Sequence, residues 1–156
     1  MSPFYIFIGY LSVGFCIASC LSESQKWFRA NNLVATLLFG ISIYGYGGIS
    51  GAYVTIFSAA VQTIILLAHN DERAKIAWLT PAFAVIVFFL SNEGLRSLLP
   101  ALASIFSFNA LISSDPLRSR IIMAGSSLLW LGYGAAVGSV PAILSDVATF
   151  TAISIK

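Results

Sequence analysis

Hydrophobic residues gather into seven long segments, and this pattern limits the possible folds more than any other feature. The segments cover residues 4–21, 31–47, 51–68, 76–91, 97–113, 120–137 and 140–155. Each has 16 to 18 residues, close to the roughly 17 that a helix needs to cross a bilayer. Only helices and closed barrels span lipid, because backbone polar groups find no partner there. Strand-like alternation is missing, so we predict an all-α polytopic membrane protein with seven transmembrane helices.

The composition points to the same class. Charged residues make up 9% of the chain and hydrophobic residues 58%, whereas a soluble domain has about 25% charged residues. The net charge of +2 is too small to suggest a nucleic-acid partner. Polar connections are too short for a soluble domain, so residues 1–156 are predicted to be one membrane domain whose first partner is the lipid bilayer.

The basic residues predict the orientation in the membrane. With seven crossings, seven of the eight basic residues fall on the side of the C-terminus, and only Arg96 falls on the other. The seven are Lys26, Arg29, Arg73, Lys75, Arg118, Arg120 and Lys156. Cytoplasmic loops of membrane proteins carry the excess of Lys and Arg. We therefore expect the N-terminus outside and the C-terminus in the cytoplasm.

Prolines and glycines predict where the helices begin, bend and turn. Pro3 and Pro100 suit the first turns of their helices, whereas Pro81 is expected to kink the interior of the fourth segment. Glycine-rich stretches at 44–51 and at Gly138-Ser139 are predicted turns between antiparallel helices. Residues 22–30 are expected to form a polar loop.

An offset of 91 residues places the first three segments on the last three. The coinciding pairs are Arg29 with Arg120, Phe39 with Trp130, Gly47 with Gly138, Leu11 with Leu102, and Phe15 with Phe106. The halves would be residues 4–68 and 97–155, with 76–91 as a linker helix. Four segments separate the starts of the halves, so both keep one orientation and form a parallel 3+1+3 repeat. The alternative is a seven-helix bundle with accidental similarity.

The last hairpin, residues 126–146, carries a resemblance to a known family. Trp130, the Gly138-Ser139 turn and Asp146 match in order and spacing the final hairpin of the YgjV-like family of bacterial inner-membrane proteins. This resemblance implies location in a bacterial inner (plasma) membrane. A more remote resemblance is to the SWEET and PQ-loop carriers, and it implies transport by alternating access. Residues 24–26 and 115–117 lie where those carriers have a Pro-Gln pair, and neither stretch of this sequence has the pair.

Asp146 is the main candidate for a functional residue. It is the only acidic residue well inside an apolar segment, and an ionisable residue at membrane depth is costly unless it has a role. It could bind a cation or proton, contact a polar substrate, or reach the headgroups about 9 Å away. Its repeat partner is Thr55. We predict that Asp146 points inward, toward the third and sixth segments, with Tyr133 as a polar neighbour.

Four further residues are candidates for contacts with a solute. Trp130 and Phe39 could stack on a flat or sugar-like solute, or could simply pack against neighbouring helices. Gln62 and Asn109 could bind a polar solute, although hydrogen bonds between helices would explain both.

The sequence gives little support for a metal site or for catalysis. His69 is the only histidine, so a metal site would lack ligands. Cys16 and Cys20 share one helix face and are interpreted as small packing residues. Catalytic motifs are missing, so we expect neither a cofactor nor enzymatic activity.

Two functions remain open. The first is a SWEET-like carrier that moves a small polar solute between the two halves. The second is a non-transporting membrane subunit or assembly factor, and the scarcity of polar residues favours it. A carrier should bring Asp146 and Thr55 to a shared central cavity, whereas a subunit should have a dry interior. A homo-oligomer is possible in either case.

Overall fold

The protein was analysed as a computed structural model that describes residues 2–22, 24–67, 75–76, 78–91, 93–112 and 116–155. This part of the chain forms seven α-helices, one 3-10 turn and no strand. The helices are α1 (Pro3–Leu21), α2 (Gln25–Gly45), α3 (Ile49–Leu67), α5 (Leu79–Leu90), α6 (Leu98–Ile112), α7 (Pro116–Val137) and α8 (Val140–Ile155), and the 3-10 turn is η1 (Gly94–Ser97). The predicted all-α class is confirmed.

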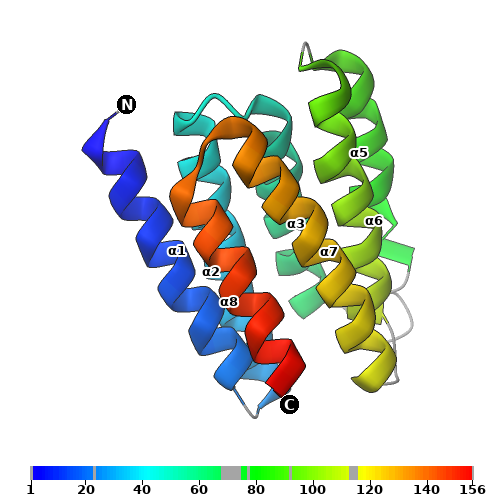
Figure 1. Cartoon of the computed structure of the whole chain (residues 1–156). Helices are drawn as coiled ribbons and strands as arrows, with labels where there is room; N and C mark the ends of the chain where they lie inside the picture. The colour runs from blue at the N-terminus through cyan, green and yellow to red at the C-terminus, as the bar shows by residue number, and fades with distance from the viewer. Residues whose placement is uncertain are drawn as a thin grey trace.

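The helices form a closed ring of antiparallel neighbours (Figure 1). Each helix packs beside the next one in the chain, α8 packs against α1, and α3 also touches α6. The two chain termini lie at opposite ends of the bundle (Figure 1). We name these the N-terminal end, which holds the α2–α3 turn, η1 and the α7–α8 turn, and the C-terminal end.

The helix starts agree with the proline positions in two cases and differ in one. Pro3 is the first residue of α1, where Ser2 accepts a hydrogen bond from the Phe4 N–H, and Pro100 is the third residue of α6. The predicted kink at Pro81 is wrong, because α5 begins at Leu79 and Pro81 lies in its first turn. A proline there leaves no intrahelical bond unmade.

Two helices begin earlier than hydropathy predicts. α2 starts at Gln25, inside the expected loop 22–30, and α7 starts at Pro116 rather than near residue 120. Hydropathy marks the part of a helix that suits lipid, and residues such as Gln, Lys and Arg are good helix formers. The helices therefore continue past their apolar parts at the C-terminal end.

Both predicted glycine turns are confirmed, and they have the same geometry. Gly47 and Gly138 have positive φ angles of 81° and 71°. The Gly48 N–H donates to the Ile43 carbonyl at 3.1 Å, and the Ser139 N–H donates to the Gly134 carbonyl at 2.9 Å. This is the bond that ends a helix at a left-handed glycine. Each turn reverses the chain within three residues.

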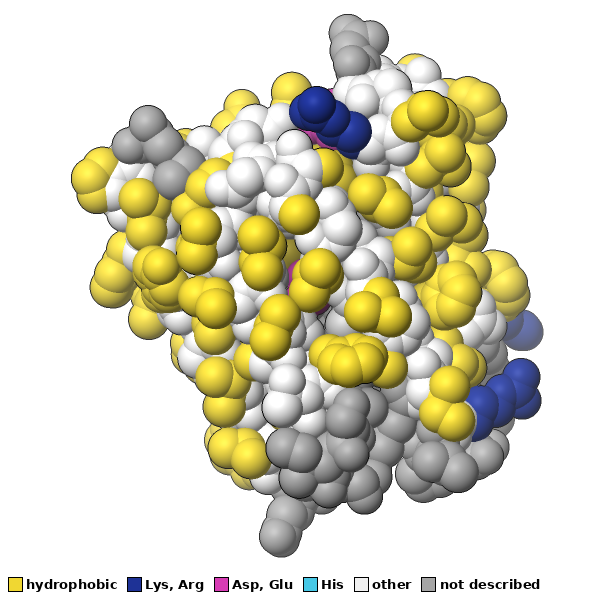
Figure 2. Space-filling model, in the orientation of Figure 1, with side chains coloured by type: hydrophobic (Ala, Val, Ile, Leu, Met, Phe, Trp, Pro, Cys, Tyr) yellow, Lys and Arg dark blue, Asp and Glu magenta, His cyan; other side chains and the backbone are white. Residues whose placement is uncertain are grey.

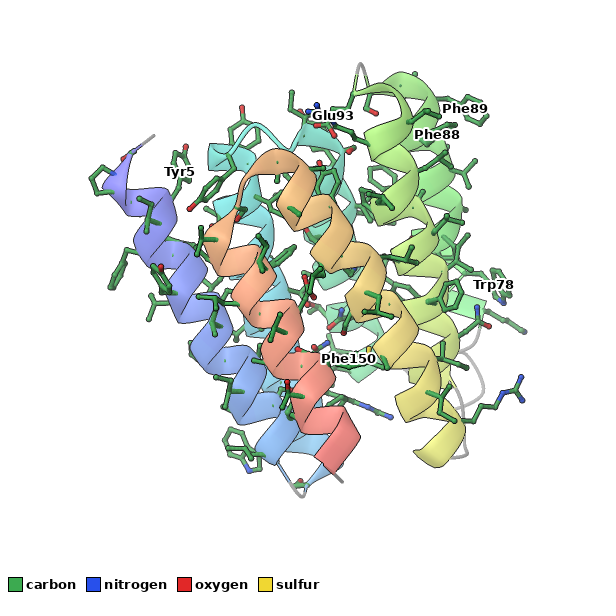
Figure 3. All side chains as sticks on the ribbon, in the orientation of Figure 1. Tyr5, Trp78, Phe88, Phe89, Glu93 and Phe150 are labelled. Carbon is green, nitrogen blue, oxygen red and sulfur yellow. The ribbon has the colours of Figure 1, made fainter. Side chains whose placement is uncertain are left out.

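The distribution of side chains is the reverse of that in a water-soluble protein. Small and hydroxyl-bearing residues dominate the interior, whereas many large apolar side chains are exposed. Among the coloured side chains on the face in Figure 2, hydrophobic ones are by far the most frequent, and the Lys and Arg side chains lie near its two ends. Trp78 and Phe89 project outward from α5 (Figure 3). Exposed apolar patches of this extent are typical of a membrane-facing surface.

Length and hydropathy identify two helices of the described chain as able to cross a membrane by themselves, namely α1 and α3. Residues 79–90, 121–137 and 140–152 form shorter apolar helices.

Candidate functional site

Asp146 lies in the second turn of α8 and is 8% exposed. Its Oδ2 atom is buried and has no hydrogen-bond partner within the described part of the chain. Figure 2 shows acidic atoms in the middle of the apolar face, between hydrophobic side chains. A buried carboxyl oxygen without a partner costs folding free energy, which favours a role outside packing.

Polar side chains of α1 contact the part of α8 that carries Asp146. The Cys16 thiol lies 2.8 Å from the Thr149 hydroxyl and also makes side-chain hydrogen bonds with Ser145 and with Cys20, which is likewise a free thiol. The Thr149 hydroxyl donates to the Ser145 carbonyl at 2.9 Å, so the thiol is the donor toward Thr149. Asp146 lies next to Ser145 in α8 and three residues before Thr149. We call Cys16, Cys20, Ser145, Asp146 and Thr149 the α1–α8 cluster.

Sequence reasoning missed the cysteines of this cluster. Both were interpreted as apolar packing residues, yet the Cys16 thiol makes polar contacts with α8. The available signal was their shared helix face. The partner face on α8 could not be identified, because α1 and α8 lie at opposite ends of the sequence.

Thr55 is buried in α3, but its hydroxyl is already engaged. The hydroxyl lies 2.7 Å from the Gly51 carbonyl and 3.0 Å from the Ala52 carbonyl. A methyl group on Gly40 would come within 2.6 Å of it, so α2 packs closely here. Thr55 therefore contributes to helix packing in this conformation.

Phe39 and Trp130 contact each other. Their ring centroids are 5.4 Å apart at an interplanar angle of 83°, an edge-to-face arrangement that aromatic pairs prefer. Trp130 also meets Tyr133 edge to face at 6.0 Å. These aromatic rings join α2 to α7 in the interior.

Tyr133 is fully buried, and its hydroxyl makes hydrogen bonds at the N-terminal end of the bundle. It donates to the Glu93 carboxylate at 2.8 Å and accepts from the Gly51 N–H at 3.0 Å. The Ser50 hydroxyl lies 3.1 Å away. These contacts occupy the hydroxyl that we expected beside Asp146.

Glu93 is the centre of a network that sequence reasoning missed. Its carboxylate accepts hydrogen bonds from the Ile49 N–H, the Ser50 N–H at 3.1 Å and the Ser50 hydroxyl, besides Tyr133. Figure 3 shows Glu93 at the N-terminal end, beside the start of α3. We call Glu93, Ser50 and Tyr133, with the first N–H groups of α3, the Glu93 clamp.

One signal for the clamp was present in the sequence. No acidic residue lies in the first turn of α3, although the free N–H groups of a helix start attract a carboxylate. Glu93 supplies it from a position more than 40 residues away. A sequence alone does not show which distant residue takes this role.

The remaining polar candidates take part in helix packing. Asn32 of α2 donates to the Gln62 side chain of α3 at 3.2 Å, and Asn109 donates to the Ile105 carbonyl of its own helix at 2.8 Å. His69 lies outside the described residues. In the part of the chain that the structure describes, no three His, Cys, Asp or Glu side chains form a group that could hold a metal ion.

Comparison with known proteins gives one match. No curated protein and no solved structure matches the chain. A family model described as a bacterial inner membrane protein, Imp-YgjV, matches residues 5–156. The match covers almost the whole chain and confirms the resemblance of the last hairpin. The chain therefore belongs to the Imp-YgjV family of bacterial inner membrane proteins.

Proposed function

We propose that this protein is a multi-pass, SWEET-like carrier that moves a small polar solute by alternating access. The observation that carries the proposal is the buried Asp146 carboxyl, whose Oδ2 atom has no partner in the described chain. A solute or a proton is the partner that this oxygen would take. Asp146 lies where α8 of one half meets α1 of the other, at a boundary that must move during alternating access.

Two interhelical hydrogen bonds support the 3+1+3 repeat on which this mechanism rests. The Ser12 hydroxyl donates to the Ala35 carbonyl at 2.9 Å, and the Ser126 hydroxyl donates to the Ala103 carbonyl at 2.9 Å. The offset of 91 residues pairs Ser12 with Ala103 and Ala35 with Ser126. The same contact therefore joins α1 to α2 and α6 to α7, with the donor on the opposite helix.

The aromatic pair supports a twofold axis through the centre of the bundle. Phe39 and Trp130 are repeat partners, and they contact each other. Residues that a twofold rotation exchanges can touch only beside its axis. The contacts of α1 with α8 and of α3 with α6 are likewise exchanged by this rotation. Residues 4–68 and 97–155 are then the two halves, and α5 is the linker helix.

Comparison of the two halves helps to distinguish a functional role of Asp146 from a role in packing. Asp146 and Cys16 correspond to Thr55 and Ser107 in the α3–α6 contact. Both positions carry a hydroxyl group there: the Ser107 hydroxyl bonds to the Ser126 hydroxyl of α7 at 2.6 Å, and the Thr55 hydroxyl bonds to carbonyls of its own helix. Packing between the halves thus does not need a carboxyl group. In the carrier, Asp146 contacts the solute, and Trp130 and Phe39 offer ring faces beside its path.

Flux into reconstituted vesicles tests the proposal. Purified protein would be screened with radiolabelled sugars, amino acids and small amines. We expect Asp146→Thr, which installs the residue of the other half, and Asp146→Asn to abolish flux of any solute found. Both should keep a wild-type elution profile in detergent, because the other half packs without a carboxyl.

Thr151→Val is the matched control, since Thr151 is an exposed residue of the same helix that bonds only to its own backbone in the contacts described. It should transport like the wild type. Normal flux in Asp146→Thr, or no flux of any solute in the wild type, would contradict the carrier.

The alternative is a non-transporting membrane subunit, and one observation favours it. Phe39, Trp130 and Tyr133 fill the space between α2, α3 and α7 with packed rings. A permanently dry interior would leave packing as the only role of the bundle. Failure of the flux screen, together with stable co-purification of a second membrane protein from its host, would support this function.

A further inference from the structure

We propose that the Glu93 clamp is the latch of a gate at the N-terminal end, and that its release opens the path between the halves. This inference names the gating residues of the proposed carrier and therefore rests on the proposed function. The motion itself can be measured without a solute.

The clamp joins three parts of the molecule that alternating access must separate. Glu93 follows the linker helix α5, Ser50 is the second residue of α3 in the first half, and Tyr133 belongs to α7 of the second half. One carboxylate accepts bonds from both halves, and the Tyr133 hydroxyl also accepts from the Gly51 N–H. Loss of the carboxylate would therefore weaken the link between the two halves at this end, where only the Tyr133 contacts with Ser50 and Gly51 would remain.

The chemistry of the clamp suits a contact that breaks and reforms. Its groups are a carboxylate, two hydroxyls and the N–H groups of a helix start, all of which water can bind when the clamp opens. Hydrogen bonds to a charged group stabilise the closed form by more than neutral ones do. The clamp can thus hold the gate closed and still open without stranding buried polar groups.

The corresponding contact at the start of α8 is built differently. Pro141 takes the place of Ser50 and has no N–H, and Ser42 takes the place of Tyr133 and donates to the Tyr5 carbonyl. A methyl group on Gly9 would lie 2.6 Å from Pro141 and 2.5 Å from the Ser42 hydroxyl. This side is closed by tight packing that a carboxylate does not control. We therefore place the gate on the α3–α7 side only.

The residues below the clamp define what its release would expose. Tyr133 packs with Ile43, Ala52 and Ala142 in one buried cluster, and Phe39 and Trp130 lie against that cluster. Ala52 is fully buried. An open gate would let water reach Ala52 first and the aromatic pair next. Ala52 is thus the position at which opening can be detected.

Cysteine labelling of the full chain tests the latch. The native cysteines are replaced by Cys16→Ser and Cys20→Ala, Ala52→Cys is the reporter, and a membrane-impermeant thiosulfonate is the probe. We expect Glu93→Gln to label about tenfold faster than the parent, because Gln has one acceptor oxygen where the carboxylate uses two, and because the charge-assisted bonds are lost. Tyr133→Phe should also accelerate labelling of Ala52→Cys.

Two controls separate gating from general loosening. Ser97→Ala removes a hydrogen bond to Gly94 in the turn that follows Glu93, without touching the clamp. Ala103→Cys is a second reporter, fully buried in α6. Unchanged labelling of Ala52→Cys in Glu93→Gln would overturn the latch, as would equal acceleration in Ser97→Ala or at Ala103→Cys. Accelerated labelling without any solute flux would keep the latch and reject the carrier.

Discussion

At the scale of single residues, the closest packing in the bundle depends on glycines that face large side chains. A methyl group on Gly51 would lie 2.2 Å from a ring carbon of Tyr133, whereas one on Gly14 would meet nothing within 4 Å. The first glycine brings α3 against α7 beside the Glu93 clamp. The second has no comparable packing role.

Gly51→Ala should lower the free energy of unfolding by about 1–3 kcal/mol, the usual cost of overpacking. Gly14→Ala should be neutral or stabilising by up to about 1 kcal/mol, because alanine favours the helix. Unfolding in detergent, followed by circular dichroism, measures both. Equal effects of the two variants would contradict the packing of Tyr133 against Gly51.

The residue scale also shows where the sequence was informative. Asp146 could be selected because a lone carboxyl in an apolar run has few explanations, and its burial agrees with that choice. Glu93 could not be selected, because it stands beside Arg96 in a short polar stretch that looks like any exposed loop. Its importance comes from contacts with α3 and α7, which are set by the tertiary fold.

At the scale of helices, hydropathy located each of the seven α-helices in the described part of the chain, but not where every helix begins. The segments at 31–47 and 120–137 are the apolar parts of α2 and α7, which begin at Gln25 and Pro116. The position of Pro81 within its helix was predicted wrongly for a related reason, because the apolar run extends upstream of the residue at which α5 begins. Turns were predicted better, since a left-handed backbone leaves glycine as the favoured residue.

Contacts between helices can be tested through the bond between Asn32 and Gln62. A double-mutant cycle with Asn32→Ala and Gln62→Ala should give a coupling free energy of about 0.6 kcal/mol, as polar pairs within membrane bundles do. Thr63 neighbours Gln62 but donates to its own helix at Ala59. Asn32→Ala with Thr63→Val should show no coupling, and a similar value in both cycles would count against the predicted α2–α3 bond.

At the scale of the whole molecule, the seven antiparallel helices and the opposite termini follow from segment counting and the distribution of basic residues. The closure of the ring by α1 and α8 could not be predicted, because no sequence pattern in either helix indicates which helix it packs against. The proposed repeat is faint in the sequence, since only a few side chains coincide. The proposal draws more support from two hydrogen bonds between a serine hydroxyl and a carbonyl, Ser12 with Ala35 and Ser126 with Ala103.

The orientation of the molecule in the membrane is a prediction for labelling in intact cells. Leu95 at the N-terminal end is 80% exposed, and Ser24 at the C-terminal end is also exposed. In a chain without native cysteines, Leu95→Cys should react with an impermeant maleimide from outside. Ser24→Cys should react only after the cells are opened. The reverse result would invert the topology and place the gate on the cytoplasmic side.

The contact between α1 and α8 has a consequence for biosynthesis. A ribosome delivers α1 first and α8 last, and a chain begins to fold as it emerges. During insertion of the intervening helices, the face of α1 that carries Cys16 has only lipid or the insertion machinery beside it. Arrival of α8 completes the Cys16–Thr149 contact and closes the ring. Because α1 is made before α8, the α1–α8 contact depends on the arrival of α8, so a nascent chain that stalls before α8 would expose the uncovered face of α1 to the quality-control proteases of the membrane.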